Sequence, residues 1–232
     1  MRCAVLSFPG SNGDMDAVYA LSDALGTPAE RVMRTETDLS RFDAAVLPGG
    51  FSYGDYLRAG AIARFAPVMT ALHAFAASGR PVLGICNGFQ VLCEAGLLPG
   101  ALLRNAELTF RSRWLHVRVE QTATPWTAGM AVGQVLHLPI AHGEGRYYAD
   151  AETLLALEES RRIVFRYCAP DGTLSASANP NASIAHIAGV CNDAGNVVGL
   201  MPHPERGAEA LLGGDDGLHV LRSVLVAGGV AR

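Results

Sequence analysis

Hydrophobic residues recur in two rhythms in the first part of the chain. Short apolar runs at 2–8, 42–48 and 81–85 have the length of buried strands, while the segments at 14–25 and 61–78 have the apolar spacing of helices. Strands that alternate with helices are typical of βαβ units. Apolar residues on both faces of a strand are typical of a parallel sheet covered by helices. A parallel sheet is therefore predicted here.

The later part of the chain has a different pattern. Residues 114–122 alternate apolar and polar side chains, 135–141 and 162–169 are also strand-like, and 215–229 return to helical spacing. These features predict partly antiparallel strands and a C-terminal helix. We expect an α/β fold with a flavodoxin-like, doubly wound, mostly parallel sheet, helices on both faces and some antiparallel later strands. A single domain over residues 1–232 is expected.

Composition narrows the class of protein. Half of the 232 residues are hydrophobic, which is enough for a full core. No window approaches the roughly 18 unbroken apolar residues of a membrane span, and the N-terminus lacks the order of a signal peptide. The five cysteines, an odd number without disulfide-like spacing, fit a reducing compartment. These features predict a cytoplasmic protein that does not bind membranes.

The charged residues argue against nucleic acid as a ligand. The formal net charge is -4, and the 18 basic residues, all of them arginine, form no basic run. No CxxC pair or zinc-finger spacing occurs, so no structural metal is expected. The lack of lysine also excludes the P-loop that binds nucleoside triphosphates.

One cysteine has an unusual setting. In VLGICNGFQVL, residues 82–92, an apolar run passes directly into Cys86, which lies between Gly84 and Gly88, and a helix-like pattern follows. This is the nucleophile-elbow pattern with cysteine in place of serine. Small flanking residues permit a sharp turn that lifts the side chain above the carboxyl edge of the sheet, at a helix N-terminus that favours thiolate. A buried core cysteine is the alternative interpretation.

A histidine near the C-terminus could supply the matching base. In GLMPHPERG, residues 199–207, a strand-like run ends at His203 between two prolines, and Glu205 follows two residues later. Side chains two apart in an extended chain point to the same side. Glu205 can therefore hold one ring nitrogen of His203 while the other faces a nucleophile. A rigid turn would explain this segment alone, but together with the elbow it predicts a Cys–His–Glu triad.

A third segment could stabilise negative charge in a reaction. In VLPGGFSYGDYL, residues 46–57, an apolar strand ends at Gly49 and Gly50. Their backbone N–H groups, with the N–H of Asn87, could form an oxyanion hole, in which one donor contributes roughly 3 kcal/mol. An ordinary tight turn is the alternative here.

These segments together resemble the class I (triad) glutamine amidotransferases, whose glutaminase domain has a G-x-C-x-G elbow and a late His-x-Glu in this order. Within that family, six blocks are similar to the glutaminase subunits of phosphoribosylformylglycinamidine synthases, and the second block is the most specific. The blocks are FPGSNGD at 8–14, PGGFSYGDYLRAGAIARF at 48–65, GICNGFQVL at 84–92, LLPGALLRN at 97–105, AHGEGRYY at 141–148 and GLMPHPER at 199–206.

The resemblance implies hydrolysis of L-glutamine to glutamate and ammonia through a glutamyl thioester. The ammonia would pass to a synthetase subunit for ATP-dependent conversion of formylglycinamide ribonucleotide in purine biosynthesis. Cys86 would be the nucleophile, His203 the general acid and base, and Glu205 its orienting partner. The resemblance places the oxyanion donors and the glutamine pocket at Gly50, Phe51, Asn87, Gln90, His142 and Glu144. It implies no cofactor in this chain: ATP and Mg²⁺ are expected on the synthetase subunit, and a small accessory subunit is a further expected partner.

Two positions depart from the family pattern. Family members commonly read GSNCD where this chain has Gly13, and NPNGS where it has NPNAS at 179–183, a stretch expected to face a partner or the pocket rim.

Two other functions remain open: a stand-alone cysteine peptidase or γ-glutamyl hydrolase with the same elbow, and a catalytically silent binding or redox module. We expect residues 53–64 to dock the synthetase subunit, and the isolated chain to be a poor glutaminase.

Overall fold

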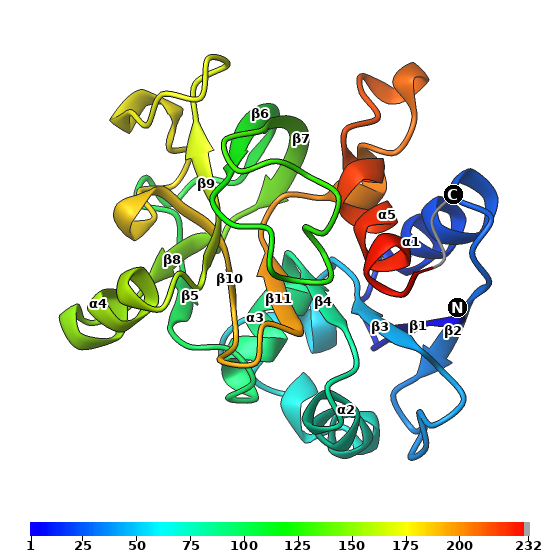
Figure 1. The fold of residues 1–232 in the computed structure, drawn as a ribbon. Helices are drawn as coiled ribbons and strands as arrows, with labels where there is room; N and C mark the ends of the chain where they lie inside the picture. Colours follow the sequence, from blue (N-terminus) through cyan, green and yellow to red (C-terminus); the bar gives the residue numbers. More distant parts are fainter. Residues whose placement is uncertain (230–232) are drawn as a thin grey trace.

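A nine-stranded sheet runs through the structure, a computed structural model that describes residues 1–229 (Figure 1). The strands lie in the order β2-β1-β3-β4-β11-β10-β9-β6-β7. Their bounds, in that order, are Ala29–Met33, Cys3–Ser7, Ala44–Leu47, Val82–Ile85, Val197–Leu200, Ile187–Cys191, Ile163–Cys168, Arg111–Val119 and Val135–His142.

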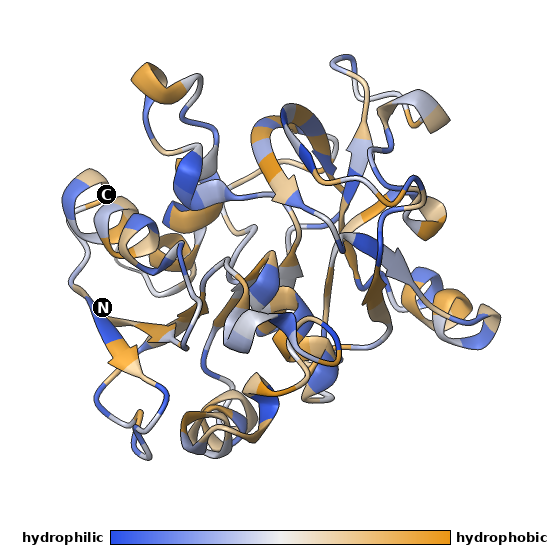
Figure 2. Ribbon diagram, turned by 180° about the vertical axis from the view of Figure 1, so that it is seen from behind, coloured by the Kyte–Doolittle hydropathy of each residue, from blue (hydrophilic) through white to orange (hydrophobic). Residues whose placement is uncertain are grey.

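The first five strands in this order form a parallel half. β1 pairs in parallel with β2 and β3, and β4 pairs in parallel with β3 and β11. Numbered along the chain within this half, the order is 2-1-3-4-5, which is the flavodoxin-like arrangement. Every residue of β1, β3, β4 and β11 is buried, as a sheet covered on both faces requires. Figure 2 shows these central strands as mostly hydrophobic. The predicted fold class is confirmed.

The other half of the sheet is antiparallel. β10 pairs with β11 and β9, and β6 pairs with β9 and β7, all of them antiparallel. Along β7, buried and half-buried residues alternate strictly, as the sequence pattern indicates for later strands. The strand expected at 114–122 is displaced and runs from Arg111 to Val119, because its pairing with β7 begins at Arg111 opposite His142.

Helices cover both faces of the parallel half, as predicted. In Figure 1, α1 (Asp14–Tyr19) and α5 (Gly217–Ala227) lie together on one side, and α2 (Pro67–Ala77) and α3 (Asn87–Glu94) lie on the other. The helix expected over 61–78 begins only at Pro67, because proline has no N–H to donate and suits the first helical position. The helix expected over 14–25 continues past α1 as a π-helical turn, Ala20–Ala24. No helix within residues 1–229 has the length and apolar character needed to cross a membrane.

A small second sheet stands beside the main one. It consists of β5 (Ala101–Leu103) and β8 (Arg146–Tyr148), which pair antiparallel, and α4 (Ala151–Glu159) follows β8. Asn105 comes just after β5, and the turn at 142–145 joins β7 to β8. The small sheet therefore brings the segments at 97–105 and 141–148 together.

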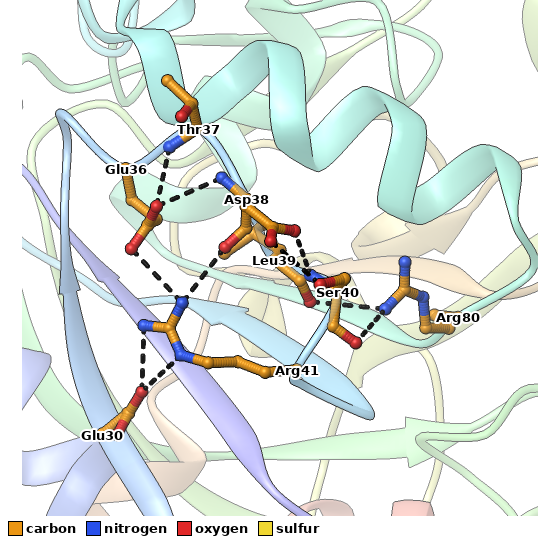
Figure 3. Close-up of polar contacts among 8 residues, drawn as sticks. All are labelled: Glu30, Glu36, Thr37, Asp38, Leu39, Ser40, Arg41 and Arg80. Carbon is orange, nitrogen blue, oxygen red and sulfur yellow. Dashed lines mark hydrogen bonds and ion pairs between the residues drawn. The ribbon is translucent and has the colours of Figure 1, made fainter.

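An exposed polar cluster closes the loop between β2 and β3 (Figure 3). The guanidinium of Arg41 contacts the carboxylates of Glu30 and Glu36 and the main-chain oxygen of Asp38. Arg80, on another loop, donates to main-chain oxygens of the same segment, among them that of Leu39. We call the group formed by Glu30, Glu36, Asp38, Arg41 and Arg80 the Arg41 cluster.

Candidate active site

The carboxyl ends of four parallel strands place the predicted site residues at one edge of the sheet. Gly50 follows β3, Cys86 follows β4, and His203 follows β11. β7 runs in the same direction as β11, because three antiparallel strands separate them, and it ends at His142. Open α/β sheets bind their ligands at this edge.

Cys86 has a backbone conformation that few side chains adopt. Its φ is 50° and its ψ is -106°, at the junction of β4 and α3. The flanking glycines make this turn possible: a Cβ at Gly84 would lie 2.7 Å from the main-chain oxygen of Gly88, and a Cβ at Gly88 would collide with that of Leu47. Such a conformation costs about 1–3 kcal/mol and is typical of functional sites. The predicted sharp turn is confirmed.

His203 and Glu205 form a buried pair beside this cysteine. Nδ1 of His203 lies 2.6 Å from Oε1 of Glu205. A Cβ at Gly49 would lie 2.5 Å from Cε1 of His203 and 3.6 Å from Cβ of Cys86. The side chains of His203 and Cys86 therefore both lie next to Gly49. The extended chain expected here is wrong, because Pro204–Arg206 form a turn of 3₁₀ helix. This turn, rather than an extended strand, brings the carboxylate back to the ring.

Opposing effects set the charge of His203. Burial lowers the pKa of the imidazole, but the carboxylate of Glu205 and the sulfur of Cys86 outweigh this effect and raise the pKa to about 10. The ring is therefore protonated at neutral pH and can donate from both nitrogens. Within residues 1–229, its buried Nε2 has no hydrogen-bond partner.

The predicted oxyanion donors lie at the ends of neighbouring strands. Gly50 has a φ of 146°, and a Cβ there would lie 2.7 Å from the main-chain oxygen of Gly10, so glycine is required. Asn87 is the first residue of α3, and N–H groups in a first turn have no acceptor within the helix. The N–H of Phe51, in contrast, donates to Gly10 over 2.9 Å. The N–H groups of Gly50 and Asn87 thus suit a developing negative charge better than that of Phe51.

A small pocket opens at Cys86. It has a volume of about 190 Å³, and its walls include the nucleophile and five of the predicted substrate residues. These five are Gly50, Phe51, Gln90, His142 and Glu144. A larger cavity of about 720 Å³ lies at the opposite edge of the sheet and contains none of the predicted site residues.

The pocket also contains residues that the sequence analysis did not assign to it: Asp55, Phe110 and Ala141. Asp55 lies in the block PGGFSYGDYLRAGAIARF, which could have drawn attention to it, whereas Phe110 carries no local signal. Burial, and then the charge of Glu144, raise the pKa of Asp55 to about 6. Within residues 1–229, no group of three or more His, Cys, Asp or Glu side chains is arranged to hold a metal ion.

Side-chain amides connect the elbow to the far wall of the pocket. Oδ1 of Asn87 accepts from the N–H of Ser52, and its Nδ2 donates to Oε1 of Gln90 over 2.9 Å. Nε2 of Gln90 donates in turn to the main-chain oxygen of Glu144 over 2.6 Å. The side chain of Gln90 therefore supports the turn at 142–145 in addition to lining the pocket.

Comparison with known proteins agrees with this geometry. Residues 1–212 match the model of the CobB/CobQ-like glutamine amidotransferase domain. The chain belongs to the glutamine amidotransferase family. It is 65% identical over 228 residues to the phosphoribosylformylglycinamidine synthase subunit PurQ of Thermomicrobium roseum, covering 98% of this chain and 97% of that one. The PurQ subunit of Moorella thermoacetica is 58% identical, with 97% and 95% covered.

A solved structure extends this likeness to the fold. A chain in the structure of PurLQS from Thermotoga maritima superposes on this amidotransferase with a TM-score of 0.86 and 41% sequence identity. The match covers 97% of this chain and 98% of that one. The likeness therefore extends over both the parallel and the antiparallel halves of the sheet.

The two departures from the family pattern lie beside the site. A Cβ at Gly13 would lie 3.1 Å from Oε1 of Glu205, so this position borders the triad. Ala182 has a φ of 61°, a conformation that glycine adopts without strain. The neighbouring Asn181 donates to the main-chain oxygen of Gly145 over 2.7 Å, which places the stretch 179–183 against the segment that leaves the pocket.

Proposed function

We propose that this chain is the glutaminase subunit of a phosphoribosylformylglycinamidine synthase. It hydrolyses L-glutamine and delivers ammonia to a synthetase subunit, which converts formylglycinamide ribonucleotide to formylglycinamidine ribonucleotide with ATP. The observation that carries the proposal is the strained Cys86 elbow, which faces the His203–Glu205 pair and opens into a pocket of about 190 Å³. The 65% identity to a PurQ subunit supports this substrate and this partner.

The first half of the reaction forms a thioester. The proton of the Cys86 thiol already lies on His203 in the resting site, and the resulting thiolate adds to the carboxamide carbon of glutamine. The N–H groups of Gly50 and Asn87 stabilise the oxyanion of the tetrahedral intermediate. His203 then gives a proton to the nitrogen, the C–N bond breaks and ammonia leaves.

The second half regenerates the thiolate. His203, now neutral, takes a proton from a water molecule that attacks the thioester carbonyl. The C–S bond breaks, which restores the thiolate beside protonated His203, and glutamate leaves. Glu205 keeps Nδ1 of the imidazole in place through both halves. No group outside this chain is needed for either step, so no cofactor is proposed here, while ATP and Mg²⁺ belong to the synthetase subunit.

Exposed apolar residues around the pocket mouth support a docking surface for that subunit. Leu57 is 89% exposed, and Tyr56 and Phe65 are each 74% exposed, within or next to the segment 53–64. Leu108 and Phe110 are also exposed, and Phe110 lines the pocket itself. Large exposed apolar side chains that gather in one place mark protein interfaces. A partner on this surface would cover the exit for ammonia.

The conformation of this segment supports control of the site by the partner. Tyr53, Asp55 and Leu57 all have positive φ angles, which are costly for residues with a Cβ. Asp55 is also part of the pocket wall. We propose that docking of the synthetase subunit and the small accessory subunit stabilises the competent arrangement, and each tenfold activation corresponds to about 1.4 kcal/mol.

Rate measurements on the complex test the proposal. Glutamine hydrolysis is compared for the chain alone and for the chain with both partner subunits, ATP and the ribonucleotide. We expect a low rate alone and a higher rate in the complex, with ammonia incorporated into the nucleotide product. Faster hydrolysis of peptides or polyglutamates than of glutamine would instead favour the peptidase or γ-glutamyl hydrolase alternative. An equally high rate in both conditions would contradict control by the partners.

A cytoplasmic location forms part of the same proposal. The five cysteines are all free thiols, as expected in a reducing compartment. The ribonucleotide and ATP that the synthetase subunit needs are cytoplasmic metabolites. Fractionation of cells followed by detection of the chain would check the location.

A further inference from the structure

Asn105 is a buried residue that supports the wall of the pocket but does not line the pocket itself. Its side chain is 1% exposed and makes four hydrogen bonds. Nδ2 donates to the main-chain oxygens of Thr109 and His142, over 2.8 and 2.9 Å. Oδ1 accepts from the N–H of Gly145 over 3.1 Å and lies 3.0 Å from Nδ1 of His142. All the hydrogen-bonding groups of this amide are therefore engaged, and three of the four bonds go to the turn 142–145.

Main-chain groups leave only one orientation for the amide of Asn105. The oxygens of Thr109 and His142 can only accept, so they must face the NH₂ group. The N–H of Gly145 can only donate, so it must face Oδ1. An exchange of the amide oxygen and nitrogen would place like groups against each other at three contacts. The orientation thus follows from the backbone.

This orientation determines the protonation of His142. Nδ1 of the imidazole faces an oxygen that can only accept, so Nδ1 carries a hydrogen. Burial, and then the charge of His203, lower the pKa of His142 to about 4, so the ring is neutral at physiological pH. A neutral ring has one hydrogen, and it is on Nδ1. Nε2 is therefore a hydrogen-bond acceptor.

This acceptor has no partner within residues 1–229. Nε2 of His142 is buried without a hydrogen bond. His142 is only 2% exposed, and it lines the pocket of Cys86. A buried polar atom left without a partner costs about 1–3 kcal/mol. Gly145 leaves room for the ring in this position, because a Cβ there would collide with Nδ1. The fold thus holds an unused acceptor in the wall of the substrate pocket.

We propose that Asn105 is a positioning residue that holds His142 in its Nδ1–H tautomer, so that Nε2 accepts a hydrogen bond from an N–H group of the bound substrate. The inference rests on the proposed function, which supplies glutamine as the substrate. It adds the polarity of the contact: the pocket wall offers an acceptor to the substrate, and Asn105, outside the pocket, decides this.

The tautomer can be tested without any activity measurement. Ring ¹⁵N spectra of the full chain labelled at histidine, assigned by comparison with His142→Phe, report which nitrogen carries hydrogen. We expect a neutral ring at pH 7 with hydrogen on Nδ1. A ring with hydrogen on Nε2, or a ring protonated on both nitrogens, would overturn the inference and leave the proposed function untouched.

A matched pair of variants tests the effect on the substrate. Asn105→Asp keeps the shape of the side chain but places a carboxylate beside Nδ1, which favours a doubly protonated ring whose Nε2 is a donor. Asn196→Asp is the control: Asn196 is also buried, and its Nδ2 also donates to two main-chain oxygens, those of Ala76 and Arg80. It lies before β11, at the edge of the sheet opposite the pocket.

The variants are compared in the complex with the synthetase subunit. We expect Asn105→Asp to raise the KM for glutamine about tenfold, as the loss of one substrate hydrogen bond would, while kcat changes much less. Asn196→Asp should lower the melting temperature to a similar extent and leave the KM unchanged. Equal KM values for Asn105→Asp and the wild type would overturn the inference.

A double-mutant cycle separates the tautomer from the shape of the turn. In the background of His142→Phe, where the ring has no acceptor, Asn105→Asp should change the KM by less than about twofold. A tenfold effect in both backgrounds would show that Asn105 acts through the turn alone, and it would overturn the proposal. A wild-type complex without any glutaminase activity would count against the proposed function, but not against the proposed tautomer of His142.

Discussion

The Arg41 cluster and the pocket of Cys86 both gather polar side chains, but they use them differently. In the Arg41 cluster the side chains are exposed or half-buried and bind one another or nearby main-chain oxygens (Figure 3). Around the pocket, His142 and Glu205 are buried, and Nε2 of His142 and Oε2 of Glu205 have no partner within residues 1–229. The Arg41 cluster thus holds a loop in place, while the pocket of Cys86 keeps polar atoms free to bind a substrate.

Burial explains why the difference matters. An exposed ion pair contributes little, because water and salt compete for both charges. A buried polar atom without a partner is costly, so it persists only where the surrounding packing holds it in place. At the elbow, Gly49, Gly84 and Gly88 permit that packing by having no Cβ. The unpaired groups of the pocket are therefore a feature of a site that awaits a substrate.

Removal of the nucleophile should have the largest effect. Cys86→Ala should abolish thioester formation and lower glutamine hydrolysis by at least about 10⁴-fold, since the residues of a triad act as a unit. The fold should persist, because the side chain borders the pocket. Rates in the complex and trapping of the thioester check this prediction. Cys93→Ala, in the same helix but outside the pocket lining, is the control and should stay active. Activity retained by Cys86→Ala would rule out its role as nucleophile.

Neutralising the orienting carboxylate should have the next largest effect. Glu205→Gln keeps the shape but removes the charge that raises the pKa of His203, so kcat should fall by about 10²-fold or more with a smaller change in KM. If only the KM changes, Glu205 contacts the substrate and another group orients the imidazole.

The same variant predicts a pH dependence of stability. The pKa of His203 in the folded state, about 10, lies above its value of about 6.5 in the unfolded chain. Protonated His203 therefore stabilises the folded state fully below pH 6.5, and this contribution disappears as the pH rises through 10. Urea unfolding should show a larger gap between wild type and Glu205→Gln at pH 6 than at pH 10. A gap independent of pH would contradict the buried ion pair.

A methyl group beside the triad should have a moderate effect. A Cβ in Gly13→Ala would lie 3.1 Å from Oε1 of Glu205 and 3.3 Å from the nitrogen of Gly49. Small shifts of either group should lower kcat by about threefold to tenfold, because triad geometry tolerates little displacement. Gly214→Ala is the control, since its Cβ would lie 3.2 Å from the ring of Trp114, away from the pocket. Equal kcat values for the two variants would show that position 13 does not influence Glu205.

Disruption of the Arg41 cluster should have the smallest effect. Arg41→Ala should leave glutaminase activity unchanged and lower the melting temperature slightly, since its partners are exposed carboxylates and main-chain oxygens. The difference from wild type should shrink in high salt, because screening already weakens the pairs that the substitution removes. A change in activity, or a loss that grows with salt, would break the contrast between the two clusters.

The local pattern of the sequence was enough for most of the parallel half and for the triad. Continuous apolar runs predicted β1, β3 and β4. The elbow indicated a nucleophile and the His-x-Glu segment indicated its base, each from a few neighbouring residues. Other elements carried weaker signals. β2 is an edge strand with only one buried residue, and α4 likewise buries only Leu157, so neither was predicted. Their positions depend on neighbours that a local pattern does not reveal.

The amino-acid sequence by itself identified the candidate nucleophile, its base and the βαβ pattern of the first strands, because these depend on residues close together in the chain. Only the tertiary structure decided the composition of the pocket. Asp55, Phe110 and His142 reach one cavity from separate segments, and Asn105 finds its four partners only when β5 and β8 pair. Long-range pairing and burial set these contacts, and the same burial makes His142 neutral and His203 charged.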